Sequence, residues 1–444
     1  MPEITVIMPA LNVAKYIRPC IESVINQSFT DLEILFIDAG STDGTLEIMQ
    51  EYASKDSRIQ LIHSDKKSYG YQMNLGISLA RGKYIGVVET DDYIEEDMYE
   101  VLYEACVRKD ADFAKGYTKQ FYTIDNEEKY FFTSNTFFVE DGIDEKEIET
   151  SKMPEILIKD RFLWLGLYKS SFVKKIRLNE TPGAAFQDQG FLLQSLSTAK
   201  KAVYVNKPVY YYRQDNNNAS SHDMKGVGYI AREYELNRHY LEGKEIEWHT
   251  AFYTRMYDQM EGRFNTMAKS GEFWKDAVAD IDIIRGWLQN AVDVGYLSEK
   301  KLDAERWRKL NTFLADRESI YKEYLEKYTS IKKEFNSLLV QIGDNPVVIF
   351  GAGKYGSFLY KILKKNQKNV VAFCDNNENL HNTKRNDKCI LSLEDAIKKY
   401  NKALFIIANA NQYIEMEEQL IKQGIEEERI GVYRLGEKTL LFGM

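Results

Sequence analysis

Residues 32–45, LEILFIDAGSTDGT, contain the strand, turn and helix start that decide the fold of the first part of the chain. Glu33–Ile37 is a run of β-forming residues that predicts a strand, and Asp38 ends it. Ser41–Gly44 then supplies the turn and the N-cap side chains that begin a helix reaching about Tyr52. A strand followed at once by a helix is the unit from which parallel, helix-covered sheets are built.

The same alternation extends over residues 1 to about 110. Further strands are predicted at Ile4–Met8, Arg58–His63 and Lys83–Val88. Apolar residues recur at helical spacing from Asn12 onward, and another helix is predicted near Tyr71–Ala80. Each strand ends in a polar or acidic cluster. Because ligands bind at the carboxyl ends of the strands in open α/β sheets, we expect these clusters to converge on one site.

The rest of the chain divides by pattern into a mixed, a helical and a second α/β part. Tyr/Phe-rich β-like runs and a helix near Gln189–Ser197 continue to about residue 220. No strand-like run follows until Val347–Phe350, after Asn345-Pro346. We therefore expect an α/β protein with three domains, residues 1–222, 223–342 and 343–444, of which the middle one is a helical connector.

The composition of the 444 residues excludes several classes of protein. The 26 Gly and 7 Pro exclude collagen-like and low-complexity chains, and the 30 Tyr and 22 Phe exclude a disordered one. The formal net charge of −9 argues against nucleic-acid binding, which needs a basic face for the phosphates. The four cysteines have neither a close pairing nor a metal-type spacing, so reduced thiols in a cytoplasmic protein are expected.

The sequence predicts no membrane span. Residues 1–12 lack the basic and long apolar regions of a signal peptide, and no stretch approaches the ~18–20 apolar residues that cross a bilayer. Peripheral membrane contact stays open. A homodimer also stays open, because apolar residues from Tyr324 to Leu338 recur at spacings of 4 and 3, as in a coiled-coil seam. A packed bundle helix is the plainer interpretation, since the seam is short.

Acidic residues follow two of the predicted strands. Asp38 ends one strand, and Glu89-Thr90-Asp91-Asp92 follows another. Adjacent carboxylates at a strand end repel each other unless a cation lies between them, and hard oxygen ligands suit Mg²⁺ or Mn²⁺. Such an ion would neutralise a diphosphate leaving group. A solvated acidic turn is the alternative interpretation of Asp91 and Asp92 taken alone.

Several separated motifs occur in one order in the first part of the chain. They are Ile4–Asn12 (ITVIMPALN), Cys20–Ser28, Glu33–Thr45, Gly70–Gly76 and Ala80–Ile85, followed by Thr90-Asp91-Asp92. Together they resemble the family 2 glycosyltransferases of the GT-A fold, over roughly residues 4 to 215. The resemblance implies a GT-A domain that binds a nucleotide-sugar donor and a glycan acceptor, the latter free or carried on a lipid or a protein.

The resemblance assigns a role to each matching residue. The donor would contact Pro9, Ala10, Asn12, Asp38, Gly70, Asn74 and Asp91. Asp38 would hydrogen-bond the base, Asp91 would face the ribose or diphosphate, and Asp92 would hold Mn²⁺ or Mg²⁺. Two positions depart from the family pattern: Ala39 stands where a second acid is frequent, and Glu89 replaces the first aspartate of D-x-D-D.

The resemblance also implies a catalytic base. Ala185–Phe191 (AFQDQGF) resembles the family's acidic motif, in which a Glu-Asp pair is usual, and Asp188 matches the catalytic aspartate. Gln187 replaces the first acid. An aspartate that faces an acceptor hydroxyl takes its proton while the sugar C1 is displaced in line. A structural role for Asp188 as the N-cap of the following helix is the alternative.

The acceptor-side candidates are Trp164, Gln187 and His222. Trp164 lies in Leu163–Lys169, which resembles the family's segment across the active site, and an indole can stack on the C–H face of a sugar. A core tryptophan fits the same pattern. His222 would reach back to the diphosphate or metal, or it would simply be a solvated loop residue.

A glycine fingerprint occurs in the last part of the chain. Gly351, Gly353 and Gly356 follow a predicted strand and precede a predicted helix, and Asp375 comes 24 residues after Gly351, at the end of the next strand. These residues are a candidate second nucleotide site in a Rossmann-like domain. No second mononucleotide half is recognisable, so structural or partner-docking use of this domain is the alternative, and a redox site is another.

The sequence therefore predicts an inverting, metal-dependent glycosyltransferase. It would move a hexose, most simply from a UDP-sugar, to a hydroxyl of a glycan acceptor in polysaccharide or glycoconjugate biosynthesis. Two alternatives stay open. One is a nucleotide-sugar-modifying or NAD-dependent enzyme centred on the C-terminal domain, and the other is a non-catalytic scaffold of a glycan-assembly complex.

Overall fold

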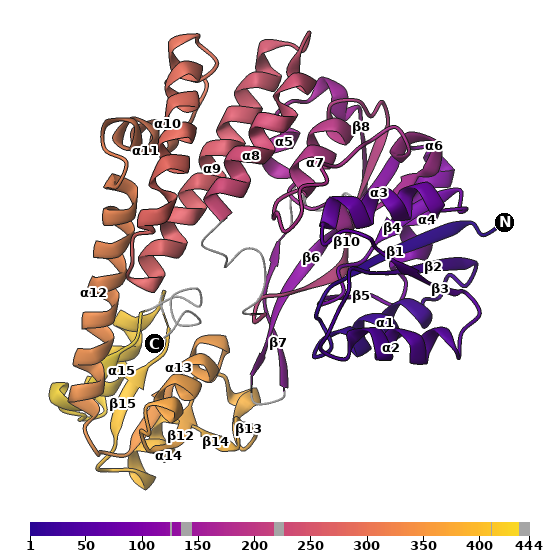
Figure 1. Cartoon of the computed structure of the whole chain (residues 1–444). Helices are drawn as coiled ribbons and strands as arrows, with labels where there is room; N and C mark the ends of the chain where they lie inside the picture. Colours follow the sequence, from indigo (N-terminus) through magenta and orange to yellow (C-terminus); the bar gives the residue numbers. More distant parts are fainter. Residues whose placement is uncertain (125–126, 135–143, 217–225, 410, 435–444) are drawn as a thin grey trace. The chain divides into compact units, whose positions relative to one another are not determined.

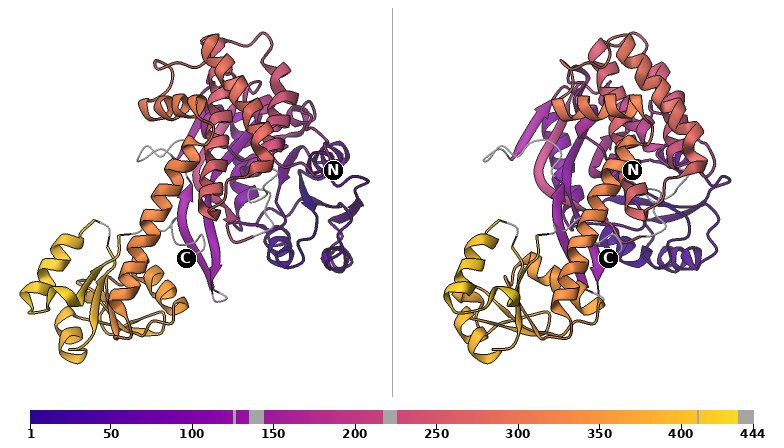
Figure 2. Two further views of the ribbon diagram at one scale, coloured as in Figure 1. Left: turned by 60° about the vertical axis from the view of Figure 1, so that its left-hand side comes forward. Right: turned by 90° about the vertical axis from the view of Figure 1, so that its left-hand side faces the viewer.

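The computed structural model describes residues 1–124, 127–134, 144–216, 226–409 and 411–434 (Figure 1). Contacts divide the chain into two compact units. The first contains Met1–Arg263 and Trp274–Ser319, and the second contains Phe264–Phe273 and Ile320–Met444. The helices between residues 226 and 342 therefore belong partly to the first unit and partly to the second. Figure 2 shows these helices along the chain.

A ten-stranded sheet forms the centre of the first unit, in the order β3-β2-β1-β4-β9-β6-β10-β5, with β7 on β6 and β8 on β10. Its strands are β1 (Ile4–Ala10), β2 (Leu32–Asp38), β3 (Ile59–His63), β4 (Tyr84–Val87), β5 (Tyr93–Ile94), β6 (Phe113–Ile124), β7 (Glu127–Ser134), β8 (Glu145–Ile148), β9 (Gly166–Lys169) and β10 (Ala202–Arg213). The first four strands pair parallel with one another, whereas β9 joins β4 and β6 antiparallel.

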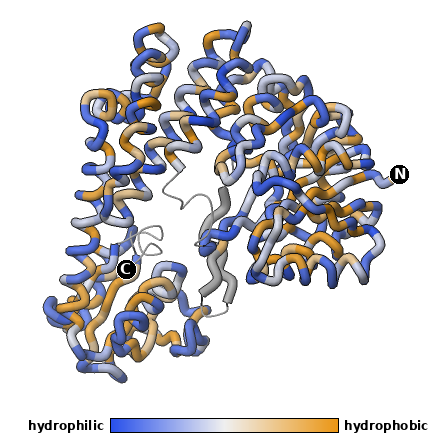
Figure 3. The backbone as a smooth tube through the Cα atoms, viewed as in Figure 1, coloured by the Kyte–Doolittle hydropathy of each residue, from blue (hydrophilic) through white to orange (hydrophobic). Residues whose placement is uncertain are grey.

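The parallel strands β1, β2 and β4 consist mainly of apolar residues, and the buried polar side chains Thr5 and Glu33 hydrogen-bond each other. Every residue of β1, β2 and β4 is buried, as expected for strands covered on both faces, and Figure 3 shows the apolar runs along the chain. The helices of this part are α1 (Ile17–Ile25), α2 (Thr45–Ala53), α3 (Tyr69–Leu79), α4 (Met98–Lys109), α5 (Ile156–Lys159), α6 (Ser170–Val173) and α7 (Asp188–Leu196). Because β2 and β4 flank β1 on opposite sides, the strand order reverses there, and a ligand crevice is expected at its carboxyl end.

Helices follow the sheet in the chain. They are α8 (Gly226–Asn237), α9 (Ile246–Ser270), α10 (Val278–Asp293), α11 (Ala304–Ala315) and α12 (Ser319–Ile342). The ion pair of Arg306 with Asp258, with Nε–Oδ1 at 2.9 Å, joins α11 to α9. None of the helices within the described ranges is long and apolar enough to cross a lipid bilayer.

The second unit contains a six-stranded sheet in the order β13-β14-β12-β11-β15-β16. Its strands are β11 (Val347–Phe350), β12 (Val370–Cys374), β13 (Lys384–Arg385), β14 (Lys388–Leu391), β15 (Leu404–Ile407) and β16 (Ile430–Val432), and its helices are α13 (Lys354–Lys365), α14 (Leu393–Lys399) and α15 (Tyr413–Lys422). All pairings except β13–β14 are parallel. The helix α13 begins at Lys354 with Gly353 as its N-cap residue, so Gly356 lies inside the helix, whereas the sequence predicted it before the helix.

Candidate active site

The loops that follow β1 and β2 lie at the carboxyl ends of these strands, where the strand order predicts a ligand crevice. Ala10 and Asp38 are register partners at the ends of these strands. The buried Asp38 carboxylate accepts hydrogen bonds from the backbone N–H groups of Gly40, at 2.9 Å, and Ser41, at 3.2 Å. Asn12 has a left-handed φ of 54°, and its Oδ1 accepts a hydrogen bond from Thr42 N at 2.8 Å.

These bonds also explain why α1 begins at Ile17 and not near Asn12, as the apolar spacing predicted. The N–H groups of Val13 and Ala14 donate to Thr45 Oγ1, at 2.8 Å, and Asp43 Oδ2, at 3.0 Å. The segment is therefore held as a loop. The structure thus brings Pro9, Ala10, Asn12 and Asp38 together, and their contacts with a nucleotide stay predictions.

The acidic segment after β4 forms the next part of the crevice. Thr90 Oγ1 donates to Pro9 O at 2.8 Å and attaches this segment to β1. Tyr69 OH donates to Glu89 Oε1 at 2.6 Å, and Glu89 N donates to Tyr210 OH at 3.0 Å. Burial, opposed by the Tyr69 bond, raises the pKa of Glu89 to about 8.

In this segment, Asp92 Oδ2 is the one buried carboxylate oxygen to which no described residue donates a hydrogen bond. Its Oδ1 accepts from Arg213 N at 2.7 Å, whereas its Oδ2 has no hydrogen-bond partner. Asp91 Oδ2 accepts from Asn216 Nδ2 at 2.7 Å. Burial, reinforced by Asp91, raises the pKa of Asp92 well above its usual range. A cation beside Asp92 Oδ2 would remove this cost of ionisation.

The donor set therefore fits a divalent cation that is only partly held by protein. Within the part of the chain that the structure describes, no three His, Cys, Asp or Glu side chains are grouped as metal ligands. Mg²⁺ and Mn²⁺ accept one or two carboxylates together with water and phosphate oxygens. Asp92, with Asp91 beside it, provides this kind of incomplete site.

Asp188 is the first residue of α7, and Gln187 occupies the N-cap position without a side-chain cap. Burial raises the pKa of Asp188, and the charge of Arg255 opposes the shift. Asp188 follows Gln187, whose Oε1 accepts from Gly70 N at 2.8 Å, and Tyr69 OH, beside Gly70, donates to Glu89 Oε1 at 2.6 Å. These hydrogen bonds connect the start of α7, and with it Asp188, to the acidic segment. This carboxylate is therefore available at the crevice, and its role as a base stays a prediction.

Gln187, Gly70 and Asn74 are engaged in bonds within the protein. Gln187 Oε1 accepts from Gly70 N at 2.8 Å, and its Nε2 donates to Asn179 O at 2.8 Å. A Cβ at Gly70 would lie 1.8 Å from Asn179 O. Asn74 Nδ2 donates to Leu178 O at 2.9 Å. These three residues fix α3 to the segment before α7, and ligand contacts by them stay predictions.

The remaining predicted residues of this unit are the acceptor-side candidates Trp164 and His222. Trp164 is 7% exposed and stacks on Tyr210 with ring centroids 4.1 Å apart and on Phe162 at 4.5 Å, so its indole lies in an aromatic cluster. Stacking of Trp164 on an acceptor sugar stays a prediction. His222 lies outside the described residues.

Sequence reasoning missed two residues that organise the crevice. Arg213, at the end of β10, donates through Nε to Asp91 O at 2.8 Å, and its backbone binds Asp92. Its position at the end of the aromatic run 209–213 was the available signal. Tyr69, whose hydroxyl binds Glu89, was missed because no sequence motif marks this tyrosine.

The glycines of the second unit shape the turn after β11. Gly351 has a φ of 110°, and a Cβ at Gly356 would lie 1.9 Å from Gly351 O. Asp375 Oδ2 accepts from Ala352 N at 2.6 Å, so this carboxylate holds the glycine turn itself. Gly353 has open space where a Cβ would be. A nucleotide at this turn stays a prediction.

Comparison with known proteins agrees with the geometry of the first unit. The model of the family described as "Glycosyl transferase family 2" matches residues 5–169. The chain is also similar to the glycosyltransferase GlyG of Streptococcus pneumoniae serotype 4, with 31% identity over 217 residues that cover 48% of this chain and 70% of GlyG. The chain belongs to the family 2 glycosyltransferases. It is therefore an enzyme of the glycosyltransferase class.

Other similarities of this family 2 glycosyltransferase cover smaller shares or show the fold alone. A chondroitin synthase of Escherichia coli is 41% identical over 118 residues, which are 27% of this chain and 17% of the synthase. The solved structure of S. aureus TarS residues 1–349 with UDP-GlcNAc has a TM-score of 0.52 at 18% identity, covering 74% of this chain and 92% of TarS 1–349. The predicted GT-A-type α/β fold is thereby confirmed.

The second unit has a match of its own. The family described as "C2185-like, N-terminal" matches residues 343–431. The matched range begins just before β11 and ends within β16, so it contains the six-stranded sheet except for the last residue of β16.

Proposed function

We propose that this family 2 glycosyltransferase is inverting and metal-dependent, and that it transfers a hexose from a UDP-sugar to a hydroxyl of a growing glycan in polysaccharide or glycoconjugate biosynthesis. The observation that carries the proposal is that hydrogen bonds of Gln187 with Gly70 and of Tyr69 with Glu89 connect the helix that begins with Asp188 to the acidic segment. In that segment Asp92 Oδ2 is buried and has no hydrogen-bond partner among the described residues. A UDP-sugar is the donor class that TarS holds in its solved structure.

The proposed reaction needs a base on the acceptor side. Asp188 accepts the proton of the acceptor hydroxyl as that oxygen attacks C1 of the sugar, and the C1 bond to the diphosphate breaks from the opposite face. A single in-line displacement of this kind inverts the configuration at C1. Asp188 is suited to the task because burial raises its pKa, which strengthens it as a base, while Arg255 keeps it ionisable.

The donor is proposed to lie along the carboxyl ends of β1, β2 and β4. Pro9, Ala10 and Asn12 would line the nucleotide pocket, with Asp38 at the base. Asp92, supported by Asp91, would hold the divalent ion, whose chemistry is to neutralise charge on the leaving diphosphate. Arg213 keeps both aspartates in place through its backbone and Nε bonds.

The test uses purified full-length chain, a panel of UDP-, GDP-, dTDP- and CMP-sugars, and thermal unfolding with and without Mn²⁺. A donor bound by the native state raises the unfolding temperature by mass action. The donor so identified then serves in a transfer assay that detects the released nucleoside diphosphate. Asp188→Asn is expected to lower kcat by about 100-fold or more and to leave the donor-induced thermal shift unchanged.

Three results would each contradict a part of the proposal. Turnover of Asp188→Asn equal to that of the unchanged chain would exclude Asp188 as the base. Full activity after treatment with EDTA, with Asp92→Asn equally active, would exclude the metal role. A glycoside product that retains the configuration of the donor C1 would exclude inversion.

We also propose that the second unit is a Rossmann-like domain. The parallel order with β12 and β15 on either side of β11, and the glycine turn at the carboxyl end of β11, support this assignment. The same thermal screen with NAD(P) and with nucleotide sugars, repeated on Gly353→Leu, tests whether the turn binds a nucleotide. A shift that the substitution leaves intact would exclude this site.

A further inference from the structure

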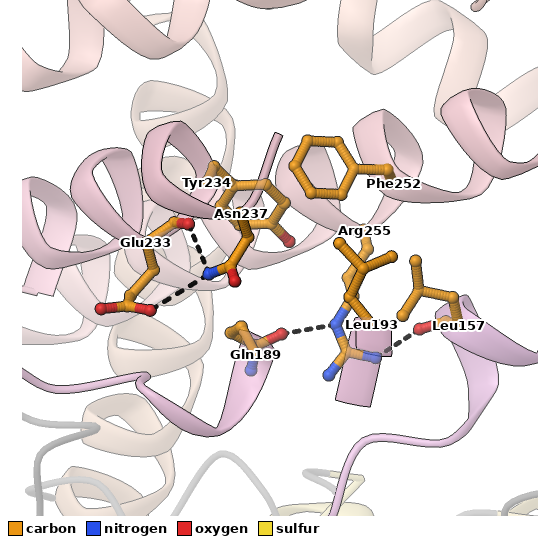
Figure 4. Close-up of a pocket in the computed structure, with 8 residues that line it drawn as sticks. All are labelled: Leu157, Gln189, Leu193, Glu233, Tyr234, Asn237, Phe252 and Arg255. Carbon is orange, nitrogen blue, oxygen red and sulfur yellow. Dashed lines mark hydrogen bonds between the residues drawn. The ribbon is translucent and has the colours of Figure 1, made fainter. Parts of the chain in front are cut away.

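A buried arginine lies behind the helix that begins with Asp188. Arg255, in α9, is 5% exposed. Its Nε donates to Gln189 Oε1 at 2.6 Å, and a terminal nitrogen donates to the backbone oxygen of Leu157 (Figure 4). The same terminal nitrogen donates to Asp160 O at 2.8 Å. Burial lowers the pKa of Arg255, but the guanidinium keeps its charge because its usual pKa lies far above neutral pH. α9 thus places a fixed positive charge beside the first turn of α7.

Gln189 connects this charge to Asp188. A guanidinium only donates hydrogen bonds, so the Gln189 side chain must present its oxygen to Arg255. The amide nitrogen then faces the other way and donates to Asp188 Oδ1, at 3.4 Å. The orientation of the Gln189 amide, and with it one hydrogen bond to Asp188, is therefore dictated by Arg255.

We propose that Arg255 and Gln189 are positioning residues of the transfer reaction, which orient the Asp188 carboxylate and balance its charge from the side of the helical segment. The inference rests on the proposed role of Asp188 as the base. It gives the helices after the sheet a part in catalysis, because the charge that faces Asp188 comes from α9 and not from the family's motifs.

Several titratable groups interact electrostatically with Asp188. They are Tyr69, Glu89, Tyr212, Glu233, Tyr234 and Arg255. Arg255 is the one cation of this set, and its charge lowers the pKa of Asp188 against the larger effect of burial. Loss of this charge must therefore raise the pKa of Asp188, so that the base becomes protonated at higher pH.

Arg255 also holds the acceptor-side segment. The backbone oxygens that it binds belong to Leu157 and Asp160, which precede Phe162 and Trp164 in the chain. One guanidinium thereby fixes both the base helix and the segment proposed to contact the acceptor. We expect its removal to raise the acceptor KM as well as to alter kcat.

The test compares pH profiles of kcat/KM for Arg255→Gln, Arg255→Lys and Gln189→Met with that of the unchanged chain, with the donor found in the thermal screen. Arg255→Gln should move the acidic limb upward by about one pH unit, and Arg255→Lys should restore most of this shift. Gln189→Met breaks the bridge while leaving the buried charge in place. It should lower kcat by about 3- to 10-fold without moving the acidic limb by a full unit, since the charge remains.

Arg306→Gln is the matched control. It removes a guanidinium that also binds α9, through Asp258, and its pH profile should equal that of the unchanged chain. If Arg255→Gln does not fold, the kcat and the pH profile of Gln189→Met alone test the inference. Unchanged pH profiles, kcat and acceptor KM in the Arg255 and Gln189 variants, with Asp188→Asn inactive, would overturn this inference only. An active Asp188→Asn would overturn the proposed function instead.

Discussion

Replacement of Lys115 by Met should destabilise the first unit strongly. The Lys115 and Asp160 side chains are each 1% exposed, and Nζ lies 2.8 Å from both carboxylate oxygens. Nζ also donates to Phe162 O at 3.0 Å, and Tyr204 OH donates to Asp160 Oδ2 at 2.7 Å. Met fills a similar volume, so the substitution removes the charge and leaves Asp160 buried without its cation.

The magnitude follows from the cost of an unpaired buried charge. Loss of one partner of a buried pair costs about 3–5 kcal/mol of unfolding free energy. The additional change Asp160→Asn removes the stranded charge, so the double variant Lys115→Met/Asp160→Asn should recover about half of this loss. For comparison, Lys169→Met removes a pair with Asp110 in which the side chains are 36% and 80% exposed, and such pairs contribute about 0–1 kcal/mol.

Tryptophan fluorescence in a urea titration is the appropriate assay. All five tryptophans of the chain, Trp164, Trp248, Trp274, Trp287 and Trp307, lie in the first unit, so the signal follows this unit alone. The unfolding midpoint of Lys115→Met should fall by about 1–2 M urea. A midpoint no lower than that of Lys169→Met, or a double variant less stable than Lys115→Met, would refute the reasoning.

Two further predictions concern the same unit and the same titration. Gly70→Ala should destabilise the first unit by more than about 2 kcal/mol, because the new Cβ would lie 1.8 Å from Asn179 O. Gly286 is exposed within α10 and a Cβ there would meet no atom within 4 Å, so Gly286→Ala should stabilise the unit by about 0.5–1 kcal/mol. Equal unfolding midpoints of the two variants would contradict this prediction. Burial raises the pKa of Glu233 from 4.5 to about 7, so the folded state holds this proton more tightly than the unfolded state and loses stability as the pH rises from about 5 to 7. Glu233→Gln should therefore gain about 2–3 kcal/mol relative to the unchanged chain between pH 5 and pH 8, and a difference that does not vary with pH would refute it.

The sequence predicted the parallel strands well because their burial is complete. The predicted strand at Val347–Phe350 agrees residue for residue with β11, and the next strand, β12, ends directly before Asp375 as predicted. A strand covered on both faces is rich in apolar residues, and such a run is visible in one sequence. Helix starts were less certain: α1 begins several residues after Asn12 because side chains of the β2–α2 loop capture the backbone of residues 13 and 14.

The sequence alone also determined the family and the candidate carboxylates, since these lie in short motifs with fixed spacing. Only the tertiary structure decided what surrounds them. Tyr69, Arg213 and Arg255 reach the acidic segment or Asp188 from elements distant in the chain, and no local pattern encodes such a meeting. The environment of a carboxylate depends on burial and on charges brought close by folding, so the pKa of Asp188 is a property of the tertiary structure and not of its motif.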